Sequence, residues 1–305
     1  MNETILTVRD FHKSYGAKIA VGGISFQVER GEIFGLLGPN GAGKTTTLEC
    51  LEGIRYPDSG EMRIMGVDPS REPRKLRNLI GVQLQTSGLP PNISVAEAMK
   101  FFSAYHGVSP RYDLLDRLGL KDKFKVQYQQ LSTGLQRRLA LALAVAHQPP
   151  ALILDEPTAG LDVESRNELH KLMLELKEAG TSILLATHDM AEAEKMTNRI
   201  AILLNGLIVA TGTARELTAT GSGYTKVSIR TEMSLLHNNG TVFPSVEKSL
   251  FKDDYAIYFS LDPAPTVTAL LEYVNSKGDR LVDLRVERPT LEERFLEITQ
   301  TGAAK

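Results

Sequence analysis

The chain has 305 residues, 42% hydrophobic and 24% charged, with 35 basic against 37 acidic residues and a net charge of −2. This composition is that of an ordinary globular protein and excludes a disordered or fibrous chain. The near-neutral charge balance supplies no bulk attraction to nucleic acid or to anionic lipid. The length leaves room for two domains.

The sequence also lacks the patterns of membrane-spanning and secreted chains. Its densest apolar run, residues 139–146, falls far short of the ~18 apolar residues that a membrane-spanning helix needs. Residues 1–9 are polar and alternating, unlike a signal peptide. The single cysteine, Cys50, cannot form an internal disulfide and fits a reducing compartment. We therefore expect a soluble, intracellular protein.

Short apolar runs and helical patterns alternate in the first half of the chain. Strands are predicted over residues 24–28 and 33–37, and a helix over residues 45–51. Residues 151–154 and 183–186 are nearly all apolar, as expected for strands buried on both faces of a parallel sheet. The segment between these two runs has apolar residues at helical spacing, which predicts a strand–helix–strand crossover.

A hairpin and a domain boundary follow. Asn205-Gly206 lies between two apolar runs and is a strong signal for a two-residue turn. Residues 219–223 are small and flexible, as in a linker. Beyond them the pattern predicts a small α+β domain. Its strands are expected near residues 227–229, 256–259 and 282–286, a helix over 267–274, and a last helix after the capping box formed by Thr290 and Glu293.

Residues 38–45 read GPNGAGKT and match the phosphate-binding loop pattern G-x-x-x-x-G-K-[ST] in full. Glycines allow backbone N–H groups to turn toward phosphate oxygens, and the following helix adds its partial positive charge. Lys44 is expected to reach the β- and γ-phosphates, and the Thr45 hydroxyl to ligate Mg²⁺. The alternative, a glycine-rich strand–helix turn without phosphate, is disfavoured because Lys44 and Thr45 are both in place and the flanking strand and helix are those that the motif requires.

Two carboxylates, Asp155 and Glu156, follow the apolar run at 152–154, where α/β sheets bind their ligands. Asp155 is expected to hold Mg²⁺ through its water shell, and Glu156 to take the proton from an attacking water. Acidic residues at a strand end can instead cap the next helix. The phosphate loop upstream favours the chemical role.

With these motifs the chain resembles the ATP-binding subunit of an ABC transporter. LSTG at residues 131–134 is similar to the family signature Leu-Ser-Gly-Gly-Gln, and AGLD at residues 159–162 to the loop that crosses the dimer. The resemblance covers roughly residues 4–217, with the motifs in the family's order. Thr133 and Leu135 depart from the signature, which affects tuning on the partner side more than hydrolysis.

The resemblance implies roles for further residues. Tyr15 stands where an aromatic ring stacks on adenine, and Gln85 where a glutamine senses Mg²⁺ and the membrane partner, with Gln83 as the alternative. His188 matches the switch histidine that contacts the γ-phosphate, although it could also cap the next helix. The implied catalytic residues are Glu156, His188 and Lys44, and the implied metal ligands are Thr45, Gln85 and Asp155. The implied ATP contacts are Tyr15, Gly38, Pro39, Asn40, Gly41, Ala42, Gly43, Lys44, Thr45, Thr46, Gln85, Ser132, Gly134 and Asp162.

The family fold is α/β, a P-loop NTPase core with a mostly parallel sheet, an antiparallel β subdomain and a helical subdomain. Carried over to this sequence, the ATP-binding domain covers residues 1–218, with its helical subdomain at about 86–150. The linker covers residues 219–223, and a small C-terminal α+β domain covers 224–305. Each motif occurs once, which implies a head-to-tail dimer around two Mg-ATP. An apparently intact motif set favours a homodimer, and a heterodimer with a related ATPase stays open.

The resemblance further implies a separate membrane permease, with the chain held on the cytoplasmic face of the cell membrane. The docking loop is expected near residues 86–93, whereas Val95, Met99 and Phe102 form a stripe typical of core. Residues 287–299, ERPTLEERFLEIT, resemble the tail of ATPases paired with ABC-2 export permeases, the daunorubicin-resistance kind among them. The resemblance therefore implies that the exported substrates are drug-like or lipidic. The tail itself could stabilise the dimer, serve the fold or regulate.

Two other classes of protein compete with this interpretation. Soluble ABC ATPases that act on the ribosome or on DNA usually carry two cassettes or a long coiled coil. Here there is one cassette, and Ser132 lies 88 positions after Lys44. A small-molecule P-loop kinase would leave the signature, Asp162 and His188 without a purpose. The acidic balance also disfavours a nucleic-acid partner.

Overall fold

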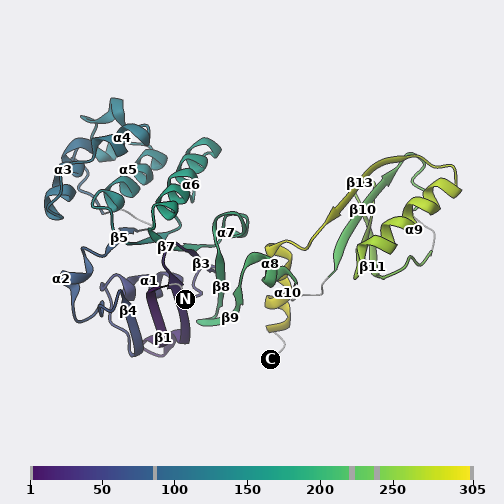
Figure 1. The fold of residues 1–305 in the computed structure, drawn as a ribbon, viewed down its shortest axis with the longest axis horizontal. Helices are drawn as coiled ribbons and strands as arrows, with labels where there is room; N and C mark the ends of the chain where they lie inside the picture. The colour runs from purple at the N-terminus through teal and green to yellow at the C-terminus, as the bar shows by residue number, and fades with distance from the viewer. Residues whose placement is uncertain (1–2, 85–87, 220–223, 237–240, 303–305) are drawn as a thin grey trace. The chain divides into compact units, whose positions relative to one another are not determined.

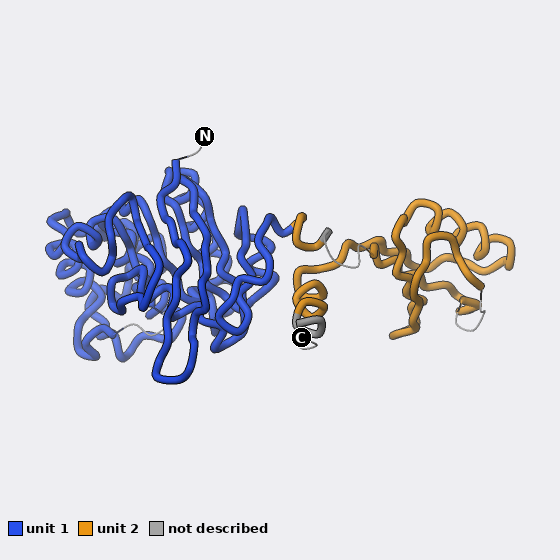
Figure 2. Tube along the Cα trace, turned by 90° about the horizontal axis from the view of Figure 1, so that it is seen from below, with its two compact units in different colours: residues 1–214 blue, residues 215–305 orange. Residues whose placement is uncertain are grey.

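The computed structural model describes residues 3–84, 88–219, 224–236 and 241–302 (Figure 1). The chain divides into two compact units, Met1–Ala214 and Arg215–Lys305, drawn blue and orange in Figure 2. Each unit contains buried hydrophobic clusters of its own. Each is therefore a separately packed body.

The first unit is built on a six-stranded sheet with the strand order β5-β6-β7-β3-β8-β9. Neighbouring strands are parallel except for β8 and β9, which form the predicted antiparallel hairpin. Asn205 and Gly206 form its turn, both with positive φ. The mostly parallel sheet is thus confirmed. Its strands are β3 (Ile33–Leu37), β5 (Ile80–Gln83), β6 (Ala151–Asp155), β7 (Ser182–Thr187), β8 (Arg199–Leu204) and β9 (Leu207–Gly212).

The central strands are buried on both faces, and alternate side chains serve two different cores. Leu152 and Leu154 of β6 pack into one cluster, while Ile153 packs into the cluster on the other face. Successive side chains of a strand point to opposite faces, so a strand between two cores must be apolar throughout. This is why these strands appear in the sequence as continuous apolar runs.

One core lies between the central sheet and a three-stranded antiparallel sheet with the order β2-β1-β4. Helix α1 (Lys44–Leu51) adds Leu48 and Leu51 to the same core. Of this sheet, only the end of β2 is predicted from the sequence. Strand β1 is not predicted, because a register shift between Val8 and Phe11 interrupts its alternation. The strands are β1 (Thr4–Tyr15), β2 (Lys18–Glu29) and β4 (Ser59–Ile64).

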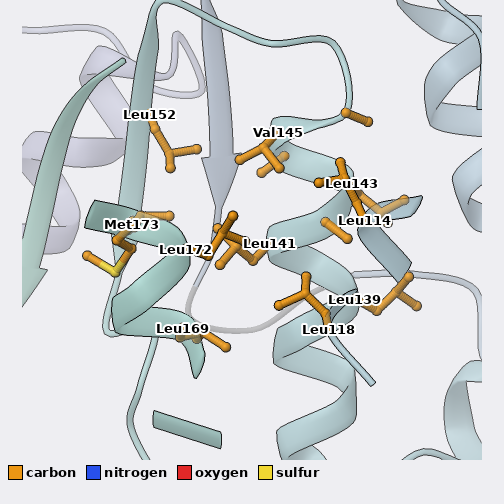
Figure 3. Close-up of a cluster of buried hydrophobic side chains, with 14 of the residues drawn as sticks. Leu114, Leu118, Leu139, Leu141, Leu143, Val145, Leu152, Leu169, Leu172 and Met173 are labelled. Carbon is orange, nitrogen blue, oxygen red and sulfur yellow. The ribbon is translucent and has the colours of Figure 1, made fainter. Parts of the chain in front are cut away.

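Helices form the other core, shown in Figure 3. Helix α3 begins at a capping box in which Ser94 Oγ accepts the Glu97 N–H and the Glu97 carboxylate accepts the Ser94 N–H. Val95 and Met99 are fully buried and Phe102 is packed against the cluster, which confirms that this stripe is core. The helices are α3 (Val95–Tyr105), α4 (Tyr112–Arg117), α5 (Thr133–Val145) and α6 (Val163–Glu178).

Short elements complete the first unit. They are α2 (Pro73–Leu76), the 3₁₀ turns η1 (Lys121–Lys123) and η2 (Tyr128–Gln130), and α7 (Met190–Met196). Across the described part of the chain, every helix is too short or too polar to cross a lipid bilayer.

The second unit is a four-stranded antiparallel sheet with the order β11-β12-β10-β13, and its core includes residues of helix α9. The predicted strands and helix are all present, together with β11, which the sequence analysis does not predict. Thr290 and Glu293 exchange the two hydrogen bonds of the expected capping box at the start of α10. Of the predicted linker, residues 220–223 lie outside the described residues. The elements are α8 (Ala214–Ala219), β10 (Thr225–Thr231), β11 (Val246–Lys252), β12 (Tyr255–Ser260), α9 (Pro263–Ser276), β13 (Leu281–Glu287) and α10 (Leu291–Gly302).

The helical core allows a test of packing. Leu141 of α5 is fully buried, so Leu141→Ala removes packed methyl groups and leaves a cavity. We expect a loss of about 2–5 kcal/mol in the free energy of unfolding, measured by urea unfolding followed by circular dichroism. The matched control is Leu174→Ala on α6, where the side chain is 39% exposed and the loss should stay below ~1 kcal/mol. Equal losses would contradict the assignment of Leu141 to the core.

Candidate functional site

The glycine-rich loop of residues 38–43 joins β3 to α1 in a tight turn. Gly41 and Gly43 have φ of 81° and 108°, a region that side chains with a Cβ avoid. A Cβ on Gly38 would lie 2.3 Å from the Leu203 carbonyl oxygen, so this position also needs glycine. The N–H groups at the start of α1 have no partner within the helix and can face an anion. The loop is thus built as an anion cradle.

Lys44 folds back over this loop instead of pointing into solvent. Its Nζ donates to the Gly38 carbonyl at 2.7 Å and to the Pro39 carbonyl at 3.2 Å. The side chain is 5% exposed, and burial lowers the pKa of Lys44, opposed by the charges of Glu156 and Asp155. A buried ammonium group over the loop suits a polyanion.

Thr45 and Asp155 meet beside the loop although they lie 110 positions apart in the sequence. The Thr45 hydroxyl donates to Asp155 Oδ2 at 3.0 Å. Burial raises the pKa of Asp155, while the hydrogen bond from Thr45 lowers it. A hydroxyl and a carboxylate at this spacing are hard oxygen donors of the kind that Mg²⁺ prefers.

Glu156 is the residue at which three contacts converge. Its Oε1 accepts from His188 Nδ1 at 2.8 Å and lies 3.8 Å from Lys44 Nζ. Its carbonyl oxygen accepts from the Arg137 guanidinium at 2.6 Å. Its φ of 47° is in the left-handed region, a strained conformation for a residue with a Cβ that is found at functional sites. The carboxylate is therefore held in one place, buried but beside the half-exposed His188.

Tyr15 joins this site from the end of β1. It lines a cavity of about 190 Å³ together with part of the loop, the residues that follow it and Glu156. The lining residues of these segments are Asn40, Gly41, Gly43, Lys44, Thr45, Thr46 and Glu156. Its ring is 40% exposed, and the Arg55 guanidinium lies 5.2 Å from the ring centroid. Lys18 and Ala20 of β2 also line the cavity, and sequence reasoning misses them because neither belongs to a recognisable motif.

Six predicted contacts lie outside the lining of this cavity: Gly38, Pro39 and Ala42 of the loop itself, and Ser132, Gly134 and Asp162 from other segments. Ser132 and Asp162 act as helix caps, accepting the backbone N–H groups of Leu135 at 3.3 Å and Ser165 at 2.8 Å. Gly134 lies in the first turn of α5, where an added Cβ would lie 3.5 Å from Leu161 Cδ2. The signature and the 159–162 loop are thus packed together within one chain.

The predicted glutamine Gln85 lies outside the described residues, so its position is not given by the structure. Strand β5 ends at Gln83, whose side chain is buried.

A buried network behind Glu156 is a second feature that sequence reasoning misses. Glu192 Oε1 accepts from the Thr158 hydroxyl at 2.6 Å and lies 3.1 Å from His170 Nε2. Thr158 follows Glu156 by two residues, so the network fixes the turn after the base. No local motif marks these residues, because they come from three separate segments.

Together these groups suit phosphoryl transfer to water. The loop and Lys44 can supply positive potential for phosphates, Thr45 and Asp155 have oxygens that a metal ion can take, and the Glu156 carboxylate is positioned as a base would be. Because the aromatic ring of Tyr15 lies at the open side, a nucleobase can stack there. The geometry fits a nucleoside triphosphate.

Comparison with known proteins agrees with this geometry. Residues 21–159 match the ABC transporter family. The chain is 36% identical over 315 aligned positions to the Nod factor export ATP-binding protein I of Paraburkholderia xenovorans (strain LB400), covering 98% of each chain. It is 32% identical to the linearmycin resistance ATP-binding protein LnrL of Bacillus subtilis (strain 168), covering 97% of this chain and 98% of that one.

A third relative and a solved structure extend the comparison. The daunorubicin resistance ATP-binding protein DrrA3 of Streptomyces coeruleorubidus is 33% identical, with 98% of this chain and 97% of that one covered. A structure described as an ATP binding subunit of an ABC transporter superposes with a TM-score of 0.68 at 29% identity, covering 72% of this chain and 94% of that chain. The chain therefore belongs to the ABC transporter family, as an ATP-binding cassette of the kind that hydrolyses ATP to drive transport.

Proposed function

We propose that this chain is the motor subunit of an export transporter, working as a head-to-tail dimer beneath a separate membrane permease. The observation that carries the proposal is the position of Glu156, whose carboxylate contacts His188 and lies near Lys44 beside the phosphate loop. The relatives that match nearly the whole chain are named for Nod factor export and for linearmycin and daunorubicin resistance. These names support export of drug-like or lipidic molecules as the role of this chain.

The chain's own groups divide the work on ATP. Backbone N–H groups of the loop and Lys44 hold the phosphates, and Tyr15 stacks on the base. Thr45 and Asp155 would hold Mg²⁺, since their oxygens lie 3.0 Å apart and are of the type this ion takes. Bound there, Mg²⁺ would supply neutralising charge on the phosphate oxygens.

Glu156 acts as the general base on the attacking water. The ring of His188 donates to the carboxylate through Nδ1, which leaves Nε2 available to the γ-phosphate. Arg137 holds the Glu156 backbone, and the contact with His188 holds its carboxylate. Positioning of this kind accounts for most of what catalysis of phosphoryl transfer requires.

A second copy would complete the site. Ser132, Gly134 and Asp162 do not line the cavity of their own chain, although their types suit contacts with a γ-phosphate or with a facing subunit. In a head-to-tail dimer Ser132 and Gly134 close over the nucleotide of the partner. Two ATP molecules then hold the dimer together, and hydrolysis releases it.

The permease is proposed to dock at the side of the helical subdomain. Residues 88 and 89, within the predicted docking loop, line a groove of about 460 Å³ with parts of α3 and α5 and the α2 region. A related solved structure at 31% identity and a TM-score of 0.63, cbiO1 from Clostridium perfringens, is described as part of an ABC transporter complex. Docking there would hold the chain on the cytoplasmic face of the membrane. The alternative of a soluble ribosome- or DNA-acting ATPase is not favoured by the export relatives.

Removal of the base tests the mechanism. Glu156→Gln should lower the rate of ATP hydrolysis by ~10²–10⁴-fold, measured by phosphate release, because the amide cannot accept the proton of the water. ATP affinity should stay nearly unchanged. Glu164→Gln, at an exposed carboxylate in the first turn of α6, is the matched control. Turnover within a few-fold of the unmodified chain would assign the base to another group.

The loop can be tested by comparing two glycines. Both Gly41 and Gly43 have positive φ, but an added Cβ meets nothing within 4 Å at Gly41 and lies 2.6 Å from the Ala20 carbonyl oxygen at Gly43. Gly43→Ala should therefore weaken ATP binding about tenfold more than Gly41→Ala, measured by equilibrium dialysis. Equal losses would show that the cradle does not depend on this close backbone approach.

The partner is tested by affinity purification of the Glu156→Gln chain from detergent-solubilised cells with Mg-ATP present. The substitution should trap the closed dimer. Recovery of a multi-span membrane protein, lost when ADP replaces ATP, is the expected outcome. Recovery of ribosomes or DNA-associated proteins without a membrane protein would overturn the proposal.

A further inference from the structure

Two cations lie over the ring of Tyr15 at the end of β1. The carbon at the centre of the Arg55 guanidinium is 5.2 Å from the ring centroid, and Lys13 Nζ is 5.7 Å from it. Both distances are within the ~6 Å at which a cation is attracted to the face of an aromatic ring. Tyr15 lines the cavity beside the phosphate loop, whereas neither cation does. The cations therefore cover a part of the ring that does not face the nucleotide site.

A carboxylate on helix α1 holds Arg55 in this position. Arg55 Nε donates to Glu49 Oε2, and the Arg55 backbone N–H donates to the Glu49 carbonyl at 3.0 Å. The hydrogen bond from Arg55 and the charge of Glu49 raise the pKa of Arg55, so the guanidinium stays charged. Helix α1 begins at Lys44, so Glu49 belongs to the same short helix as the lysine over the phosphate loop. Arg55 thus joins the ring of Tyr15 to the helix of the phosphate site.

A second carboxylate holds Lys13 and the backbone just before the ring. Lys13 Nζ donates to Asp58 Oδ1 at 2.6 Å, and the Ser14 N–H donates to Asp58 Oδ2 at 2.7 Å. The Asp58 N–H in turn donates to the His12 carbonyl at 3.0 Å. The short segment that follows α1 therefore fixes both the end of β1 and the cations over its aromatic ring.

These contacts matter because the Tyr15 side chain is 40% exposed. A side chain this exposed keeps rotamer freedom in the free protein, and a ligand that stacks on it must remove that freedom on binding. A cation that is itself held by an ion pair restricts the ring before the ligand arrives. The guanidinium is the better of the two for this purpose, since its flat face can stack on the ring.

We infer that Arg55 is a positioning residue for the nucleobase, which it affects only through the ring of Tyr15. Arg55 holds the ring in the orientation that stacks on the base, and Glu49 keeps that orientation in line with the helix that begins at the phosphates. The inference rests on the proposed function, in which Tyr15 stacks on the base. The attraction of a cation to an exposed ring corresponds to a change of about two- to five-fold in nucleotide affinity.

The test compares a ligand that has a base with one that lacks it. The full chain is titrated by calorimetry with ADP and with pyrophosphate, both in the presence of Mg²⁺. Arg55→Ala should weaken ADP binding about two- to five-fold and leave pyrophosphate binding unchanged, because pyrophosphate has nothing to stack on Tyr15. Arg55→Lys keeps the charge and should recover part of the loss. Unchanged pyrophosphate binding also shows that the variant chain is folded.

Arg63→Ala is the matched control. Arg63 also donates through Nε to a carboxylate, that of Glu61, and its side chain is 38% exposed against 45% for Arg55. Arg63 does not line the cavity beside the phosphate loop, so its removal should change the affinity for neither ligand. An equal loss with both arginine variants would assign the effect to general surface charge and overturn the inference.

A double substitution shows whether Arg55 acts through the ring. In a Tyr15→Leu chain, which should already bind ADP more weakly, Arg55→Ala should cause no further loss. A further loss there, an equal loss of pyrophosphate binding or an unchanged ADP affinity of the Arg55→Ala chain would each overturn the inference and leave the proposed function standing. Failure of the unmodified chain to bind ADP would instead overturn the proposed function.

Discussion

The three contacts of Glu156 depend on parallel strands that end at a common edge of the sheet. Strand β3 leads into the loop that carries Lys44, β6 into Asp155 and Glu156, and β7 into His188. Since β7 lies between β3 and β6, the three strand ends are neighbours in space. A shift of one residue in the register of β6 would turn Asp155 to the opposite face of the sheet. The chemistry therefore depends on the pairing of strands that are far apart in sequence.

That arrangement works against the stability of the fold. Lys44, Asp155 and Glu156 are all less than about a tenth exposed, and removing charges from water costs free energy that their mutual attraction only partly returns. The directions of two pKa shifts express this: burial lowers the pKa of Lys44 and raises that of Asp155. The positive φ of Glu156 adds backbone strain, held by the bond from Arg137. Several unfavourable contributions to the free energy of folding at one place are expected where function, rather than stability, selects the residues.

Most of the phosphate loop, the strand that ends at Asp155 and the parallel core could be predicted from the sequence. Each is a local pattern, because the loop needs glycines at fixed positions and a strand between two cores must be apolar. The contacts of Arg137 and the Thr158–Glu192–His170 network could not, since they join segments that only the tertiary fold brings together. Strand β1 was hidden for another reason. Its bulges break the period of two on which a strand prediction rests.

The groove beside the helical subdomain and the site around the phosphate loop are joined by the same two elements of the fold. Helix α1 begins at Lys44 and has Glu52 as its C-cap, so its 8 residues, about 12 Å of helix, join the phosphate loop to the groove. On the other side, Gln83 of β5 pairs with Leu154, the residue before Asp155. Because a short helix and a paired strand are stiff, a displacement of either element at the groove would also displace the residues that face the phosphates. If the permease binds at this groove, its affinity and that of ATP must change each other by the same factor, whichever binds first.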